Sequence, residues 1–233
     1  MRLGMILKER NRIDLGKRIG RALLAVGLSL WAGGCALASV ASEAAPSIFV
    51  LTTPMVEFGE GREMLPLQLV VDEPYAPAAL DSNRIVFQPS ANEIGYLGRA
   101  RWSDRAPQMV QVLLVDALDR SAGFQAVGRK AVGMRSDYLV RISIGSFGVL
   151  KGETGADGTP DRVIVDLKAQ LVRRFSDEIV AAERFYAEAE PGSSRTIDIV
   201  GAFDVATSQA LSGLSVWLYE AASAAEARMN GGS

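Results

Sequence analysis

The strongest constraint on the fold is an alternating segment at residues 162–171, which is followed closely by a second strand-like segment at residues 179–189. Apolar and polar side chains alternate along the first segment, and a period of two places them on opposite faces of a β-strand. The apolar face consists of Val163, Val165, Leu167, Ala169 and Leu171. Because only a short polar link, residues 175–178, separates the two segments, we expect an antiparallel hairpin.

The apolar face of such a hairpin needs a cover, and two helical patterns can supply it. The first helix is predicted to begin after Ser103 or Asp104 and to end at Gly123. Its apolar stripe consists of Met109, Val110, Leu113, Leu114, Ala117 and Leu118. The second helix is predicted from about Ile197 to Ala225. Its apolar stripe consists of Phe203, Ala206, Ala210, Leu214, Trp217 and Leu218.

Shorter strand patterns precede and separate these elements. They lie at residues 47–53, 65–71, 84–88, 93–97, 124–128 and 137–147. Strands, a helix, further strands, a hairpin and a last helix, in that order and without an internal repeat, predict a single-domain α+β fold. We expect a mixed or mostly antiparallel sheet with two main helices packed on one face.

The N-terminal segment has the pattern of an export signal. Seven basic residues within residues 1–21 precede 13 uncharged, mostly apolar residues, Ala22–Gly34. A membrane-spanning helix needs roughly 20 such residues, whereas a basic region, a short apolar region and small residues at a cleavage site are typical of a secretory signal. The next residue is Cys35, the only cysteine of the chain, and translation can start at Met1 or Met5.

This arrangement resembles the lipobox of bacterial lipoproteins. In those proteins a diacylglycerol is attached to the cysteine sulfur, the signal is cut before the cysteine, and the new amine is acylated. The resemblance therefore implies lipidation of Cys35. The pattern departs from the usual one at Ala32, where leucine is more common, whereas Gly33 and Gly34 suit the peptidase. The alternatives are an ordinary signal peptide with a cysteine at this position by chance, or a buried free thiol.

The chain is accordingly divided into four parts. We expect a lipoprotein signal at residues 1–34, a lipidated flexible tether at 35–46, the folded domain at 47–226 and a loose tail at 227–233. The lipoprotein pattern implies the cell envelope of a Gram-negative bacterium, on the periplasmic side. Ala36 favours the outer membrane, because aspartate at this position retains enteric lipoproteins in the inner membrane.

Charge and composition exclude several classes of function. Residues 1–34 hold seven of the 25 basic and two of the 27 acidic residues, so the remainder holds 18 and 25 and is acidic. This balance argues against nucleic acid as a partner and against a broad basic face for anionic lipid. The chain has no histidine, which removes the commonest general base and metal ligand. We expect no catalytic residue, no metal site and no cofactor beyond the acyl chains on Cys35.

An ordered set of short motifs runs through the domain. It opens with Leu80, Asp81, Arg84 and Ile85, continues with Tyr96, Arg101 and Trp102 before the first helix, and follows that helix with Phe124 and Val127. Later members are Asp137 to Leu139, Phe147, Phe185, Ala202 to Asp204, Ala206 and Trp217. Together with the lipobox, this set resembles the family of ABC-type transport auxiliary lipoproteins, which includes the paraquat-inducible C-type lipoprotein.

The resemblance implies a non-enzymatic role. Such lipoproteins work with an ABC permease and ATPase and with a membrane-anchored MCE-domain protein, and together they move lipids or other hydrophobic molecules between the two membranes. Self-association into a homo-oligomer is also implied. Arg84, Tyr96, Arg101 and Trp102 are the candidate interaction residues, although each can instead be a packing or capping residue.

Two other functions stay open at this stage. A stand-alone envelope lipoprotein could carry a lipid in its own cavity, and an apolar closed cavity would favour that function. An esterase or glycosidase is disfavoured, because the chain lacks histidine and offers no distinctive pair of carboxylates.

Overall fold

The computed structural model describes residues 45–231, except 60, 91, 130–134 and 152–161. The described chain belongs to one compact unit that begins at Pro46. The signal expected at 1–34, Cys35 and the tether up to residue 44 lie outside the described residues, as do residues 232 and 233.

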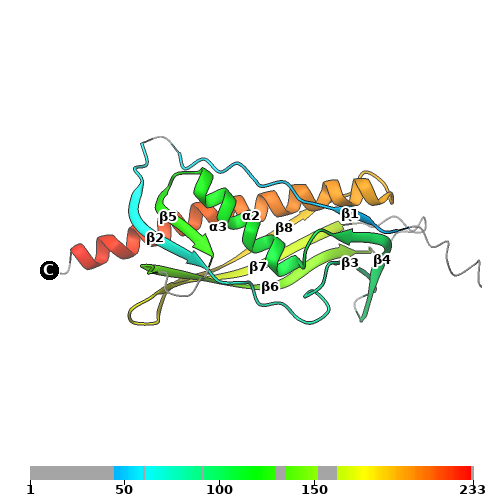
Figure 1. Cartoon of the computed structure of the whole chain (residues 1–233), viewed down its shortest axis with the longest axis horizontal. Coiled ribbons are helices and arrows are strands. Elements are labelled where there is room, and N and C mark those ends of the chain that lie inside the picture. Colours follow the sequence, from blue (N-terminus) through cyan, green and yellow to red (C-terminus); the bar gives the residue numbers. More distant parts are fainter. Residues whose placement is uncertain (1–44, 60, 91, 130–134, 152–161, 232–233) are drawn as a thin grey trace, which may run out of the picture. The chain divides into compact units, whose positions relative to one another are not determined.

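The described residues form eight strands and two helices, in the order shown in Figure 1. The strands are β1 (Ser47–Phe49), β2 (Leu65–Val71), β3 (Arg84–Ser90), β4 (Glu93–Trp102), β5 (Phe124–Arg129), β6 (Tyr138–Leu150), β7 (Arg162–Arg173) and β8 (Glu178–Ala189). The helices are α2 (Ala106–Arg120) and α3 (Thr196–Asn230). This composition confirms the expected α+β fold.

The sheet is built around the long strand β6. On one side, β6 pairs antiparallel with β7, which pairs antiparallel with β8, so the predicted hairpin is confirmed. On its other side, the two ends of β6 pair parallel with β2 and with β3. β2 continues in parallel to β5, whereas β3 continues antiparallel to β4 and then parallel to β1. The sheet is mixed as expected, with three antiparallel and four parallel pairings among the described strands.

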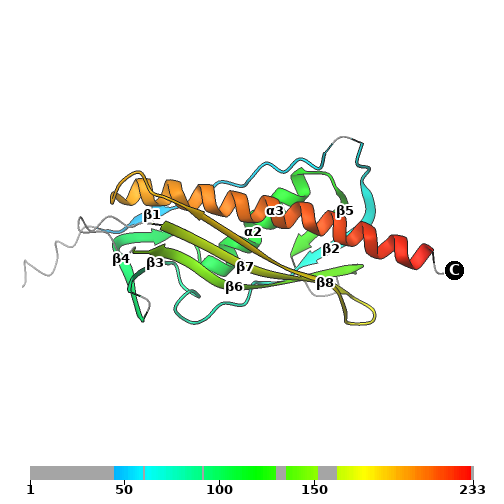
Figure 2. The ribbon, with the colours of Figure 1, turned by 180° about the vertical axis from the view of Figure 1, so that it is seen from behind.

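Both helices lie on one side of the sheet, as Figures 1 and 2 show from opposite directions. α3 packs across β7 and β8, and α2 packs against β5 and α3. Three rings form the centre of the core. The Trp102 ring centroid lies 4.9 Å from that of Phe203 and 6.0 Å from that of Phe147. These contacts join β4, β6 and α3, so the core closes only when sheet and C-terminal helix meet.

Several element boundaries differ from the sequence-based expectation, and those of α3, β1 and β4 differ most. α3 runs to Asn230, so residues 227–230 are the exposed last turn of a helix rather than part of a loose tail. Alanine-rich sequence favours the helix there, and Arg228 suits its negative C-terminal end. β1 stops at Phe49 because the chain then leaves β4, and Thr52 donates from its backbone N–H to the Asp204 carboxylate on α3, at 2.7 Å. β4 extends to Trp102.

Among the residues that the structure describes, one helix, α3, is long and apolar enough to cross a membrane by length and composition alone. More than half of its most apolar window, 56 %, is buried inside the domain. α3 is therefore explained as the core helix of this fold.

The start of α3 is held by a cluster of polar side chains. Arg195 forms a two-pronged ion pair with Asp198, at 3.0 and 3.1 Å, and the Ser193 hydroxyl also donates to Asp198. The Arg195 guanidinium, and then the Ser193 hydroxyl, lower the pKa of Asp198. A carboxylate in the first turn also complements the positive end of the helix.

Asp198→Asn is expected to destabilise the domain at neutral pH but not in strong acid. Because the folded-state pKa is lowered, the stabilisation is complete above the ordinary aspartate pKa near 3.8 and is lost as the pH falls through the lowered value. Thermal unfolding of both forms between neutral and strongly acidic pH measures this. Asp177→Asn, in the exposed turn between β7 and β8, is the control. An equal Asp198 effect at every pH would contradict the prediction.

Candidate functional site

The four residues singled out by sequence occupy two different environments. Trp102 is 1 % exposed and belongs to the core, which confirms its alternative interpretation as a packing residue. Arg84, Tyr96 and Arg101 lie on the outer side of β3 and β4. The strand pattern explains this division, because Arg101 alternates with buried Ala100 and Trp102.

The first motif of the set is largely structural. Leu80 and Ile85 are buried in the core. Asp81 and Glu73 both form ion pairs with Arg105, the residue that precedes α2. These two carboxylates raise the pKa of Arg105 above its ordinary value. The motif therefore fixes the loop before β3 against the start of α2.

Arg84 and Tyr96 form a stacked pair. The Arg84 guanidinium carbon lies 3.5 Å from the centroid of the Tyr96 ring, which is close enough for a cation–π interaction. The Tyr96 hydroxyl donates to the Ala79 carbonyl oxygen at 3.4 Å. Arg101 donates from Nη1 to the carbonyl oxygen of Ala100 at 2.8 Å. These contacts hold both guanidinium groups near the outer surface without neutralising their charges.

A third arginine, Arg99, lies at a bend in β4, two residues before Arg101. The pairing of β3 with β4 shifts register between Arg84 and Val86, and Arg99 adopts a left-handed backbone with φ of 57°. Arg99 is exposed, and it was missed in the sequence analysis because only the preceding Gly98 marks an irregularity. None of Arg84, Arg99 and Arg101 forms an ion pair within the part of the chain that the structure describes.

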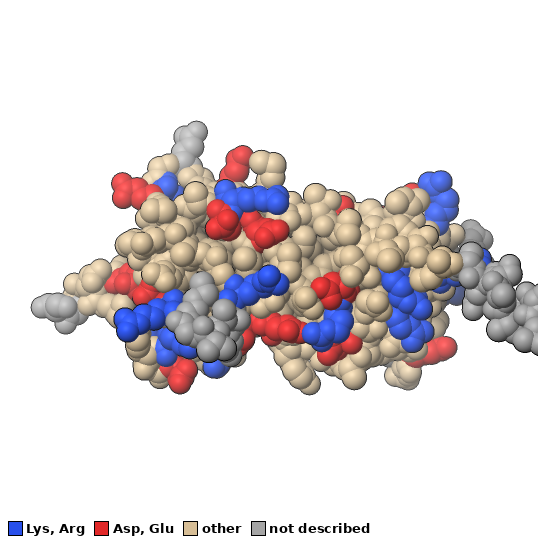
Figure 3. All heavy atoms as spheres, in the orientation of Figure 1, with Lys and Arg blue, Asp and Glu red and all other residues tan. Residues whose placement is uncertain are grey.

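Apolar side chains continue this surface across β1. Ile48 is the register partner of Arg101, and Arg101 is the register partner of Arg84, so the three side chains form a row across β1, β4 and β3. Ile48 is 69 % exposed, and Val50, two residues on, is 68 % exposed. We call Ile48, Val50, Arg84, Arg99 and Arg101 the arginine surface. In Figure 3, basic side chains lie over the β3 and β4 end of the molecule, and others lie over its middle and its opposite end.

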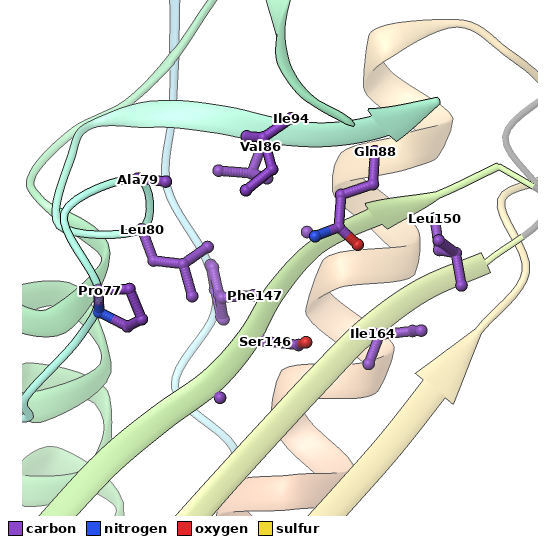
Figure 4. Close-up of a pocket in the computed structure, with 12 residues that line it drawn as sticks. Pro77, Ala79, Leu80, Val86, Gln88, Ile94, Ser146, Phe147, Leu150 and Ile164 are labelled. Atoms are coloured by element: carbon purple, nitrogen blue, oxygen red, sulfur yellow. The ribbon is translucent and has the colours of Figure 1, made fainter. Parts of the chain in front are cut away.

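A small apolar recess lies next to Tyr96. Figure 4 shows side chains from the loop before β3, from β3 and β4, and from β6 and β7 turned toward it. Its volume is about 110 Å³, and its walls include Leu80, Val86, Ile94, Phe147 and Ile164. Ligand pockets usually measure about 300–1,000 Å³, so this recess is too small for a lipid molecule.

Two shallow hollows flank the exposed side of α3. One lies between α3 and residues 52–55, and the other lies between α3 and residues 188–192. Val205 borders both hollows and is half exposed. They are open to solvent along their length, so neither encloses a ligand.

The outer side of the hairpin carries a buried carboxylate with a partner. Asp166 on β7 accepts two hydrogen bonds from the Arg184 guanidinium on β8, at 2.7 and 3.0 Å. A Cβ atom at Gly145 would lie 2.7 Å from Oδ2 of Asp166, so the close approach of β6 requires glycine at this position. The pairing gives Asp166 a structural explanation, because a buried carboxylate needs a hydrogen-bonded partner.

The described residues contain no group of acidic, cysteine or histidine side chains that could hold a metal ion. The surface can instead bind anions through guanidinium groups and contact apolar material through Ile48 and Val50.

Known structures share this fold. A crystal structure of a Xanthomonas campestris protein superposes with a TM-score of 0.71 at 24 % identity, over 77 % of this chain and 98 % of that one. A second, uncharacterised protein superposes with a TM-score of 0.56 at 15 % identity, over 75 % of this chain and 99 % of that one. At these identities the similarity establishes the fold alone.

Sequence comparison establishes the family. An uncharacterised Bradyrhizobium diazoefficiens protein is 27 % identical over 168 residues, which are 72 % of this chain but only 43 % of that protein. This chain therefore spans less than half of that relative. The family model for the ABC-type transport auxiliary lipoprotein component matches residues 49–214. The chain therefore belongs to the family of ABC-type transport auxiliary lipoprotein components.

Proposed function

We propose that the protein is a non-catalytic auxiliary lipoprotein of an MCE-type ABC system that moves lipids or other hydrophobic molecules between the inner and outer membranes. It is anchored in the outer membrane through acyl chains on Cys35 and faces the periplasm. It docks an MCE-domain protein, and the ABC permease and ATPase supply the energy. Its family membership supports this assignment.

The close packing of the described apolar faces is the observation that favours an assembly role over a stand-alone carrier. The apolar faces of β6, β7 and α3 pack on one another, and the apolar recess beside them measures only about 110 Å³. A protein that shielded a lipid by itself would need a far larger enclosed volume. The exposed surfaces of the domain are therefore the better candidates for function.

The side chains also favour a non-catalytic role. The chain has no histidine, and its single cysteine is assigned to the anchor. The described carboxylates with clear partners, such as Asp166 and Asp198, pair with arginines that explain them structurally. Burial, and then the hydrogen bond that the Tyr138 hydroxyl donates to Glu226, raise the pKa of Tyr138 and keep it protonated.

The edge strand β8 supports self-association. Among the described strands it pairs only with β7. The backbone groups along its other side therefore have no strand partner among them. Edge strands of this kind are common sites of strand pairing between chains. We propose that the protein forms homo-oligomers, because of this edge strand and because the family resemblance implies self-association.

Purification of the tagged native protein from its own cells in mild detergent tests the proposed function. We expect mass spectrometry to find an MCE-domain protein and an ABC permease enriched over a control purification with an unrelated tagged envelope lipoprotein. The native mass of the eluted complex reports self-association. Recovery of the protein alone, with lipid bound to it, would contradict the assembly role and support the stand-alone carrier.

A further inference from the structure

The arginine surface lies where the folded domain joins the expected anchor. β1 starts at Ser47, and Ile48 is the first residue of the row that continues through Arg101 to Arg84. Eleven residues, 36–46, separate this point from Cys35, and a fully extended chain of that length spans at most roughly 36 Å. With Cys35 in a membrane, this end of the domain stays close to the lipid surface.

The chemistry of the surface suits phospholipid headgroups. Guanidinium groups form strong, two-pronged hydrogen bonds with phosphate oxygens. Arg84, Arg99 and Arg101 make no ion pair among the described residues, so their charges are available. Ile48 is the register partner of Arg101, and the exposed side chains of Ile48 and Val50 can enter the boundary between headgroups and acyl chains.

The net charge of residues 35–233 bears on which side of the domain faces the membrane. Residues 35–233 hold 18 basic and 25 acidic residues, so an anionic membrane repels the domain as a whole. A local group of three arginines without ion-pair partners is attracted to the same membrane. Each basic residue near an anionic bilayer adds its own share of binding free energy. The domain is therefore turned so that this group faces the lipid.

We propose that the arginine surface rests on the anionic phospholipid surface of the membrane that holds Cys35. This inference depends on the proposed lipid anchor. The contact fixes the orientation of the domain and leaves the C-terminal end of α3, which lies at the opposite end of the domain in Figure 2, accessible to protein partners.

The experiment uses the full, natively lipidated protein in vesicles of phosphatidylcholine with or without phosphatidylglycerol. Because Cys35 is the only cysteine and its sulfur carries lipid in the proposal, Val50→Cys can be labelled selectively with an environment-sensitive dye. Ala227→Cys, at the exposed C-terminal turn of α3, is the matched control at the opposite end of the domain (Figure 2).

We expect the dye at position 50, and not the dye at position 227, to enter a less polar environment when phosphatidylglycerol is present. High salt reverses the change, because it screens the attraction. Replacement of Arg84, Arg99 and Arg101 by glutamine lowers the ratio of docked to undocked protein roughly fivefold for each residue. Replacement of the same three residues by lysine retains most of the docking, since the charge is kept.

Three outcomes would overturn the inference, and they are distinguishable. If the protein floats with the vesicles but the dye at position 50 reports the same polar environment as the dye at position 227, the proposed anchor is supported and the proposed docking is wrong. If the protein does not float, the proposed anchor fails first. If the glutamine variant docks normally on vesicles but no longer co-purifies with a permease or an MCE-domain protein, the surface belongs to a protein partner.

Discussion

Trp102→Ala is expected to lower the free energy of unfolding by about 3–5 kcal/mol. Trp102 is 1 % exposed, and its ring makes edge contacts with the Phe147 and Phe203 rings. Its removal costs the transfer free energy of a large apolar side chain and leaves a cavity among three elements that cannot readily collapse. A domain of ordinary stability has only about 5–15 kcal/mol to lose, so this variant should be close to unfolding.

Urea denaturation measures the loss, and Trp217→Ala provides a matched control. Trp217 is only partly buried on α3, where its ring makes one edge contact with Phe185 at 5.6 Å. We expect Trp217→Ala to lower the free energy of unfolding by about 1–2 kcal/mol, because folding removes less of the Trp217 side chain than of the Trp102 side chain from water. Equal losses for the two variants would show that Trp102 is not at the centre of the core.

Cys35→Ser is expected to abolish stable membrane attachment of the mature protein. Each buried methylene of an acyl chain contributes about 0.8 kcal/mol of membrane affinity, and more than one chain is needed for stable anchoring. Without the sulfur, the diacylglycerol cannot be added. The variant should therefore remain uncleaved in the inner membrane or become soluble, which membrane fractionation and the mass of the chain together determine.

Ala32→Leu is the matched control for this prediction. It restores the leucine that is usual three residues before a lipidated cysteine, so it should leave cleavage and anchoring intact. The proposed anchor would be wrong if the Cys35→Ser protein were still cut at the same place and still fractionated with the outer membrane.

The local part of the fold was predictable from sequence. The β7–β8 hairpin followed from the alternation in β7 and a short link, and both helices followed from apolar spacing. The parallel pairings of β6 with β2 and β3 did not follow, because these strands are separated by long stretches of chain. Periodicity shows which face of a strand is buried but not which strand lies beside it.

The candidate site was only partly predictable. Arg84 and Arg101 were named because of the family resemblance, and the structure places them in adjacent strands. Arg99 lies two residues before Arg101 in β4, at a bend with a positive φ that the sequence marks only weakly. Ile48 was assigned to a strand, but its exposed position beside Arg101 depends on the parallel pairing of β1 with β4.

The position of α3 after all of the described strands has a consequence for synthesis. α3 covers β7 and β8 and supplies Phe203 to the core, and it comprises the last long segment of the sequence. A ribosome therefore releases all eight described strands before it releases the helix that covers β7 and β8. Until α3 is made, the core lacks Phe203 and this cover, a delay that suits the proposed export in an unfolded state.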